Sequence, residues 1–278
     1  MLKDETKTAS GTLKHRFVWA LVMWALSERK ITSSTTVYDS TSGNTGASEA
    51  YMCSLIGVPY VAVIAENLEQ AKRDQITQFN GTLMPVDTTL RNYHAKKAAD
   101  DNGGFFINQF GNAEAAEEFH ESGTISSVGK YITRYNVKTA VVLADSQYSL
   151  FYDYVLSKNL LREVIDKVVR IPDIASVAAM MLLRTHLQVD AGVSTALNFL
   201  VALHTAITHE RNINISLVAI MGDPGKFYES TYHNNTWVDQ VFADYGGMKT
   251  LNCWFAEIGK SVQQGTNFMT EGQRLCKK

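Results

Sequence analysis

The sequence has few cysteines, few prolines and no excess of charge of either sign. Its 278 residues include 26 basic and 28 acidic side chains, so the formal net charge is only −2. Nucleic-acid backbones attract strongly positive surfaces, and this balance therefore argues against nucleic acid as a partner. Apolar residues make up 45% of the chain, which is ordinary for a globular protein of one large or two modest domains.

The three cysteines, Cys53, Cys253 and Cys276, are an odd number without the spacing of metal ligands, and the seven histidines show no metal pattern either. This usage argues against a disulfide framework and favours structural thiols in a reducing compartment. The chain starts with charged residues rather than an apolar segment, and polar residues interrupt the apolar stretch 193–207. We therefore expect a soluble, cytoplasmic protein with no metal ion and no membrane partner.

From residue 36 onward, short apolar runs alternate with segments of helical period, which is typical of an α/β fold with mainly parallel sheets. The pattern predicts strands at 36–38, 59–64, 83–86, 105–107, 139–143 and 215–221. The intervening helices are expected at 43–54, 68–79, 89–101, 175–187 and 195–204. We place a boundary near Ala115, which gives an N-terminal lobe of residues 1–115 and a C-terminal lobe of residues 116–278.

Two polar loops that contain glycine lie immediately before predicted helices. Thr8–Arg16 includes Lys14, and Asp39–Gly46 ends in Ser-Gly-Asn-Thr-Gly. The first N–H groups of a helix have no partner within the helix and can bind an anion. Ordinary turn chemistry also uses Ser, Gly, Asn and Thr, so the order and spacing of the two loops carry the functional argument.

This order and spacing resemble the fold-type-II pyridoxal phosphate (PLP) enzymes of the cysteine synthase and cystathionine β-synthase family. There a Lys-Asp-Glu strand leads to an Asn-Pro-Thr-Gly-Ser-Phe-Lys-like segment and then to a Ser-Gly-Asn-Thr-Gly loop. Here Lys3–Glu5, Ser10–Lys14 and Ser42–Gly46 take these places. Segments 171–178 and 222–228 are most similar to the cysteine desulfhydrase-like subgroup. The resemblance implies the two-lobed fold of tryptophan synthase β, PLP as cofactor and Lys14 as the catalytic Schiff-base lysine.

The resemblance also implies further site residues. Asn44 is expected to hydrogen-bond the ring hydroxyl of the cofactor, and Ser194 to face its pyridine nitrogen. Ser194 fits equally well as the cap of a helix that starts at Thr195. Gly123 and Thr124 are what remains of the phosphate loop, since the leading glycines of the family are absent. The implied substrate-carboxylate ligands are Thr41, Ser42, Gly43, Thr45 and Gln109.

The implied reaction is β-elimination or β-replacement on a cysteine- or serine-type amino acid. A lysine amine can condense with the cofactor aldehyde, and the resulting electron sink stabilises a carbanion at the substrate α-carbon. By the same resemblance we expect a homodimer. The shortened phosphate loop leaves an alternative, a non-catalytic paralogue or an incomplete gene prediction that keeps the fold but binds PLP poorly. A serine/threonine dehydratase is disfavoured because that branch usually has Ser-Gly-Asn-His.

Overall fold

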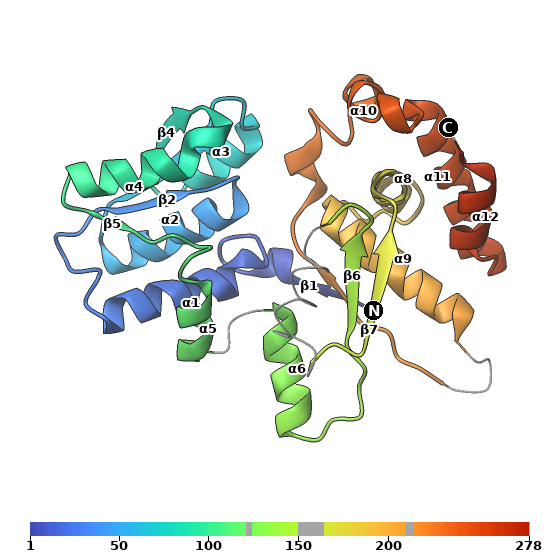
Figure 1. Cartoon of the computed structure of the whole chain (residues 1–278), viewed down its shortest axis with the longest axis horizontal. Coiled ribbons are helices and arrows are strands. Elements are labelled where there is room, and N and C mark those ends of the chain that lie inside the picture. Colours follow the sequence, from blue (N-terminus) through green and yellow to red (C-terminus); the bar gives the residue numbers. More distant parts are fainter. Residues whose placement is uncertain (121–123, 150–163, 210–213, 278) are drawn as a thin grey trace. The chain divides into compact units, whose positions relative to one another are not determined.

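The computed structural model describes residues 1–120, 124–149, 164–209 and 214–277, and it has the α/β architecture with parallel sheets that the sequence predicts (Figure 1). The chain divides into two compact units, Thr6–Val128 and a second unit made of Met1–Glu5 with Gly129–Lys278. The lobe boundary near Ala115 stays a prediction. Among the described residues, no helix is long and apolar enough to cross a membrane.

The unit Thr6–Val128 is built on a four-stranded parallel sheet in the order β4-β3-β2-β5. The strands are β2 (Val37–Ser40), β3 (Tyr60–Ala65), β4 (Thr82–Val86) and β5 (Phe105–Phe106). The helices that begin in this unit are α1 (Lys14–Ser27), α2 (Asn44–Ile56), α3 (Gln70–Thr77), α4 (Arg91–Asp101), α5 (Ala113–His120) and α6 (Thr124–Arg134). The four strands predicted in this part of the chain are thereby confirmed.

Local sequence explains the centre of this sheet. The run Tyr60–Ala65 is apolar without alternation, and five of its six residues are buried, as expected of a strand covered on both faces. Helix α2 ends where Gly57 takes the left-handed conformation (φ 72°), which glycine adopts without steric cost. The Ser-Gly-Asn-Thr-Gly loop follows β2, and its last three residues form the first turn of α2.

The second unit contains two short parallel strand pairs, β1 with β8 and β6 with β7. Their bounds are β1 (Leu2–Asp4), β6 (Val142–Ser146), β7 (Lys167–Ile171) and β8 (Ala219–Met221). Its helices are α8 (Asp173–His186), α9 (Val193–Thr208), α10 (Asn235–Val241), α11 (Gly247–Gln264) and α12 (Phe268–Leu275). Helix α8 is the most buried of these, because α9 and α11 both pack against it (Figure 1).

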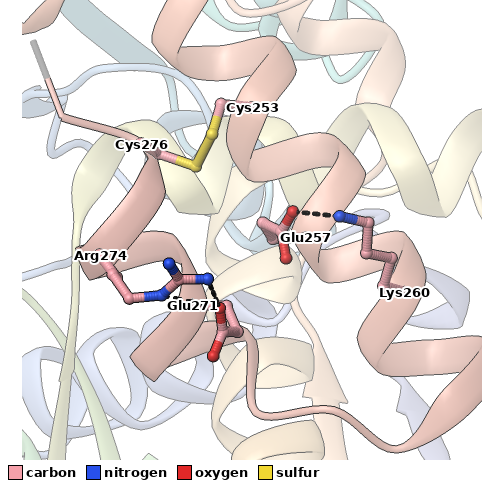
Figure 2. Close-up of a disulfide and its surroundings, with 6 residues drawn as sticks. All are labelled: Cys253, Glu257, Lys260, Glu271, Arg274 and Cys276. Carbon is pink, nitrogen blue, oxygen red and sulfur yellow. Dashed lines mark hydrogen bonds and ion pairs between the residues drawn. A yellow bond between two sulfur atoms is a disulfide. The ribbon is translucent and has the colours of Figure 1, made fainter.

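A disulfide joins α11 to the residue that follows α12, which corrects the expectation of three free thiols. Cys253 and Cys276 are bonded, with their Cα atoms 5.4 Å apart (Figure 2). Only the expectation for Cys53 holds, since this thiol is free and buried. The number of cysteines did not reveal the pair, because the reversal of the chain after α11 brings together two residues that lie 23 positions apart.

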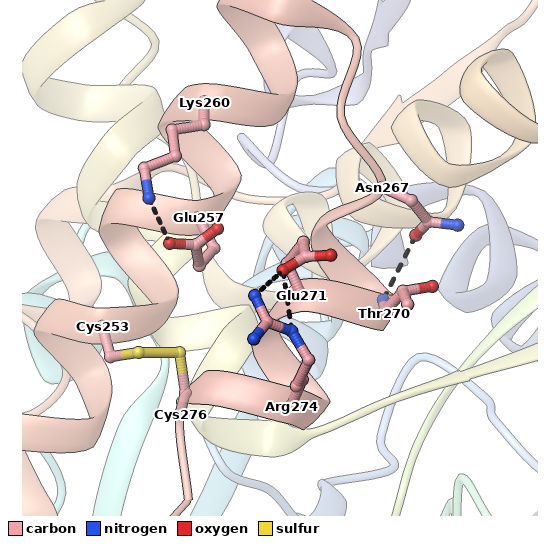
Figure 3. Close-up of polar contacts among 8 residues, drawn as sticks. All are labelled: Cys253, Glu257, Lys260, Asn267, Thr270, Glu271, Arg274 and Cys276. Atoms are coloured by element: carbon pink, nitrogen blue, oxygen red, sulfur yellow. Dashed lines mark hydrogen bonds and ion pairs between the residues drawn. A yellow bond between two sulfur atoms is a disulfide. The ribbon is translucent and has the colours of Figure 1, made fainter.

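The start of α12 is fixed by a side-chain cap. The Asn267 side-chain oxygen accepts the backbone N–H of Met269 at 3.1 Å. It also accepts the backbone N–H of Thr270 at 3.4 Å (Figure 3). Phe268, the first helical residue, is fully buried in the core of this unit. The cap, the buried ring and the disulfide together hold α12 along α11.

Candidate active site

Lys14 is the first residue of α1, and its side chain is exposed. The loop before it is fixed by Thr8, whose hydroxyl oxygen accepts the N–H of Thr12 at 3.0 Å and donates to the carbonyl of Thr12 at 2.8 Å. Gly11 makes the turn with a φ of 75° and donates its N–H to the Thr8 carbonyl. A rigid turn thus presents the lysine at the helix start.

The Ser-Gly-Asn-Thr-Gly loop leads directly into α2, and Asn44 is the first residue of that helix. Thr41 Oγ1 accepts the N–H groups of Gly46 at 2.9 Å and of Gly43 at 3.3 Å, so this hydroxyl folds the loop over the start of the helix. Gly43 has a φ of 132°, which other residues rarely adopt, and a Cβ on Gly46 would lie 2.5 Å from Thr41 Cγ2. The two glycines are therefore required by the conformation of the loop.

The structure brings the lysine loop and the asparagine loop together through two serines. Ser10 and Ser48 share a hydroxyl hydrogen bond of 2.8 Å, and Ser48 also donates to the carbonyl oxygen of Asn44 at 3.1 Å. Both serine side chains are buried. The carbonyl of Ser10 accepts a further hydrogen bond from Gln75 Nε2 at 3.1 Å. The segment that precedes Lys14 is thus anchored to the helix that begins with Asn44.

Gln109 hydrogen-bonds the end of β2, just before the Ser-Gly-Asn-Thr-Gly loop. Its amide nitrogen donates to Asp39 Oδ2 at 3.0 Å and to the carbonyl oxygen of Ser40 at 2.9 Å. Both partners are acceptors, which fixes the orientation of the amide and uses both of its hydrogens. In this arrangement the amide nitrogen has no hydrogen left for a substrate carboxylate, and the role predicted for Gln109 stays a prediction.

Two buried carboxyl groups near this loop were missed in the sequence. Burial raises the pKa of Asp39 from 3.8 to about 6, although hydrogen bonds from Glu49, Ser40 and Gln109 oppose this shift. Burial also raises the pKa of Glu49 well above its ordinary value, and the neighbouring Asp39 charge adds to the effect. The two carboxyls with raised pKa values therefore lie on either side of the predicted ligand loop in the chain.

The remaining predicted cofactor residues also lie at helix starts. Thr124 is the first residue of α6 and is exposed, whereas Gly123 lies outside the described residues. Ser194 is the second residue of α9, is exposed and belongs to the second compact unit. The alternative that Ser194 caps this helix is wrong, because Gly192 occupies the N-cap position. The cofactor role of Ser194 stays a prediction.

Comparison with known proteins decides the family. The family model of the pyridoxal-phosphate dependent enzymes matches residues 1–126. A Caenorhabditis elegans protein that is named as pyridoxal-phosphate dependent is 42% identical over 353 residues, which cover 99% of this chain and 81% of the relative. The chain belongs to the pyridoxal-phosphate dependent enzyme family. The alignment is longer than the 278 residues of this chain, so the relative has internal segments that this chain lacks.

Further relatives agree with this family. The L-cysteine desulfhydrase Cds1 of Mycobacterium tuberculosis is 29% identical over 299 residues, which cover 88% of this chain and 81% of that protein. The solved structure of O-ureido-L-serine synthase is similar with a TM-score of 0.68 at 21% identity, over 82% of this chain and 84% of that one. The O-acetylserine dependent cystathionine β-synthase of Helicobacter pylori gives 0.65 at 18% identity, over 83% and 88%. These structures confirm the predicted fold class.

The donors present fit PLP, the cofactor of this family. Lys14 offers a primary amine, which can condense with an aldehyde, and Asn44 offers an amide that can hydrogen-bond a ring hydroxyl. Lys14 and Thr124 are exposed at helix starts, and Asn44, at a third, is partly exposed. Helix starts favour anions such as the cofactor phosphate and the substrate carboxylate. Lys14, Asn44 and Thr124 are thus chemically compatible with PLP, whereas Gly123 lies outside the described residues.

Proposed function

We propose that this protein catalyses PLP-dependent β-elimination or β-replacement on a cysteine- or serine-type amino acid. The carrying observation is the Ser10–Ser48 hydrogen bond, which anchors the Lys14 segment to the helix that begins with Asn44. Relatives named as L-cysteine desulfhydrase and cysteine synthase support this reaction class. The activity is that of a lyase if elimination prevails and of a transferase if a second nucleophile is added.

In this proposal each residue has one task. The bound cofactor supplies an electron sink for the carbanion at the substrate α-carbon. Lys14 would hold the cofactor through its amine, and its Nζ would accept the substrate α-proton. Asn44 orients the cofactor ring, and the hydroxyl of Ser194 offers the pyridine nitrogen a neutral partner. Thr124 and the N–H groups at the start of α6 hold the phosphate.

The substrate carboxylate binds at the start of α2. Backbone N–H groups of the loop and the hydroxyls of Ser42 and Thr45 donate to it, and the positive end of the helix dipole favours its charge. Thr41 Oγ1 already accepts two N–H groups, so its own O–H is the hydrogen that can reach the carboxylate. Gln109 supports this loop from behind through the Ser40 carbonyl.

The test uses purified protein saturated with PLP. We expect a visible chromophore that shifts when cysteine is added and disappears in Lys14→Ala. The matched control is Lys30→Ala, which removes an exposed lysine just beyond the other end of α1 and should keep the chromophore. Release of sulfide and pyruvate from cysteine alone indicates elimination, whereas dependence on an added thiol indicates replacement. Colourless protein under saturating PLP would refute the proposal and favour the non-catalytic paralogue.

We further propose a homodimer, on the family resemblance alone, and a cytoplasmic location. Sedimentation of the purified holoenzyme tests the first, with one species of about twice the 30.9 kDa chain mass as the expected result. Fractionation of cells tests the second. A monomer at micromolar concentration, or recovery of the protein in a membrane or secreted fraction, would contradict these two statements.

A further inference from the structure

Two buried acidic residues lie on either side of the β2–α2 loop, residues 41–43, in the chain. Asp39 is the penultimate residue of β2 and is 1% exposed, and Glu49 lies in the second turn of α2 and is 0% exposed. The proposed substrate-carboxylate ligands Thr41, Ser42, Gly43 and Thr45 lie between them in the chain. Each oxygen of a buried carboxyl pair needs a hydrogen-bond partner, because a buried polar group without one destabilises the folded state.

The donors around the pair fall on two sides. Tyr60 donates its hydroxyl hydrogen to Glu49 Oε2 at 2.6 Å. Gln109 Nε2 donates to Asp39 Oδ2 at 3.0 Å, and the backbone N–H groups of Ser40 and Gln109 also hydrogen-bond the Asp39 carboxyl. Asp39 is therefore surrounded by donors and acts as the acceptor.

The other oxygen of Glu49 shows where a proton is needed. Among the described residues, Glu49 Oε1 is buried and accepts from no N–H or hydroxyl group, and the neighbouring Asp39 is close enough for its charge to raise the pKa of Glu49. Two ionised carboxylates can only accept, so one of the pair has to donate. Asp39 is the carboxyl with three other donors, which leaves Glu49 Oε1 as the site of the proton.

The electrostatics of the cluster agree with this count. Burial raises the pKa of Glu49 well above its ordinary value, and the charge of Asp39 adds to the shift. Burial likewise raises the pKa of Tyr60, with the charges of Glu49 and Asp39 as further causes, so its hydroxyl keeps its hydrogen. The buried thiol of Cys53 also has a raised pKa, chiefly through burial and then through Glu49. None of these groups is basic, and a second negative charge in the cluster would lack a counter-charge.

We propose that Asp39 and Glu49 share one proton held on Glu49, and that the chain Tyr60–Glu49–Asp39–Gln109 positions the substrate-carboxylate loop. This inference rests on the proposed function for the identity of the ligand. Asp39 and Glu49 are positioning residues, since they act through Gln109 and the loop and not on the reacting atoms. The site thereby acquires a second layer of hydrogen bonds beneath its ligands.

The connections explain how the pair acts on the loop. In this proposal the proton held between Asp39 and Glu49 ties the strand on one side of the loop to the helix on the other. Gln109 then binds the Ser40 carbonyl at 2.9 Å, and Arg91 Nη1 binds the Thr41 carbonyl at 2.9 Å. Loss of the carboxyl pair removes one of the supports of the loop, and substrate binding then has to order the loop.

The first experiment compares Glu49→Gln with Glu49→Leu in the PLP-saturated enzyme. A glutamine keeps both bonds of a neutral glutamic acid, because its amide donates to Asp39 and its carbonyl accepts from Tyr60. We expect Glu49→Leu to raise KM for cysteine about tenfold with a smaller change in kcat, as a lost buried hydrogen bond predicts. Glu49→Gln should recover most of this loss. Equal damage by both variants would overturn the proton assignment.

The second measurement observes the proton directly. The infrared carbonyl band of a protonated carboxylic acid should be present in the wild-type protein at neutral pH and be absent from Glu49→Gln. Glu257→Gln is the matched control, because Glu257 is also a buried glutamate but has an ammonium partner, Lys260 Nζ, at 2.6 Å (Figure 3). Absence of the band from the wild type, or its loss in Glu257→Gln instead, would overturn the proposal.

The two proposals fail in different ways. If the protein neither binds PLP nor consumes cysteine, the proposed function is wrong, but the infrared band and the thermal stabilities of the Glu49 variants still report on the proton. If the enzyme is active and Asp39→Asn leaves KM for cysteine unchanged, the proposed function stands and the positioning role is refuted.

Discussion

Removal of the Cys253–Cys276 disulfide should destabilise the C-terminal helices measurably. Cys253→Ser and Cys276→Ser each open a loop whose ends are 23 residues apart. The chain-entropy relation for a loop of this length gives a loss of about 3 kcal/mol in the free energy of unfolding. For a domain of this size, that loss corresponds to a decrease in Tm on the order of 5–10 °C. The double variant should lose no more than either single one, because one substitution already breaks the bond.

The contacts that surround the bond indicate why the covalent link dominates. The Glu271–Arg274 pair on α12 is largely exposed, with the Arg274 side chain 64% accessible, so we expect Arg274→Ala to change stability by less than about 1 kcal/mol (Figure 2). Lys260 is also exposed at 53%. Loop closure, and not these surface ion pairs, then sets the size of the effect.

The assay is thermal unfolding of the wild type and both serine variants, each with and without a thiol reductant. The reductant should lower the Tm of the wild type to that of the variants and leave the variants unchanged. Titration of the denatured, unreduced wild type should detect one thiol, that of Cys53. Three free thiols, or a reductant effect of less than about 1 °C, would refute the reasoning.

Two further predictions concern stability. Gly272→Ala places a Cβ 2.1 Å from Trp254 Cζ3 and should lower the free energy of unfolding by about 1–3 kcal/mol in denaturant titration. In contrast, Gly259→Ala, whose Cβ meets only Leu182 at 3.7 Å, should raise it by about 0.5–1 kcal/mol, and equal effects would contradict the packing argument. Burial raises the pKa of Asp39 to about 6 in the folded protein. As the pH falls, Asp39 therefore binds its proton at a higher pH in the folded state than in the unfolded state. The stability of the wild type relative to Asp39→Asn should therefore increase by about 2 kcal/mol as the pH falls from about 7.5 to about 4.5, and a flat difference in pH-dependent denaturation would contradict it.

The fold class and the N-terminal sheet were predictable because their signals are local, whereas β7 and the helices α10, α11 and α12 were not predicted. The apolar run at 59–64 predicted a buried strand, and the structure has β3 at Tyr60–Ala65. The predicted helix 195–204 is longer at both ends, at Val193–Thr208, because Gly192 supplies the N-cap and the apolar pattern extends further than the polar residues indicated. The ends of elements depend on such caps, and the periodic centres do not.

The candidate site was predictable only in its chain order. The spacing of Lys14 and Asn44 indicated the family, but nothing local indicated that Ser10 and Ser48 would connect their segments. The Asp39–Glu49 contact was equally hidden, since an acidic residue in a loop or helix is usually solvated. The pairing of Cys253 with Cys276 was missed for the same reason. Contacts between residues that are distant in the sequence follow from packing. They cannot be deduced from the composition or from whether the number of cysteines is odd or even.

The buried acid pair also bears on the choice between an active enzyme and a non-catalytic paralogue. Burial raises the pKa of both Asp39 and Glu49, which means that the interior disfavours their charges. Apolar side chains of similar volume would satisfy the fold as well or better. In a non-catalytic paralogue that only keeps the fold, the pair has no use. In an enzyme that has to hold a carboxylate-binding loop in one conformation, the pair supplies hydrogen bonds on both sides of that loop. The buried pair therefore favours an active enzyme over a non-catalytic paralogue. The two residues that lower the stability of the fold are next to the loop where the substrate is proposed to bind.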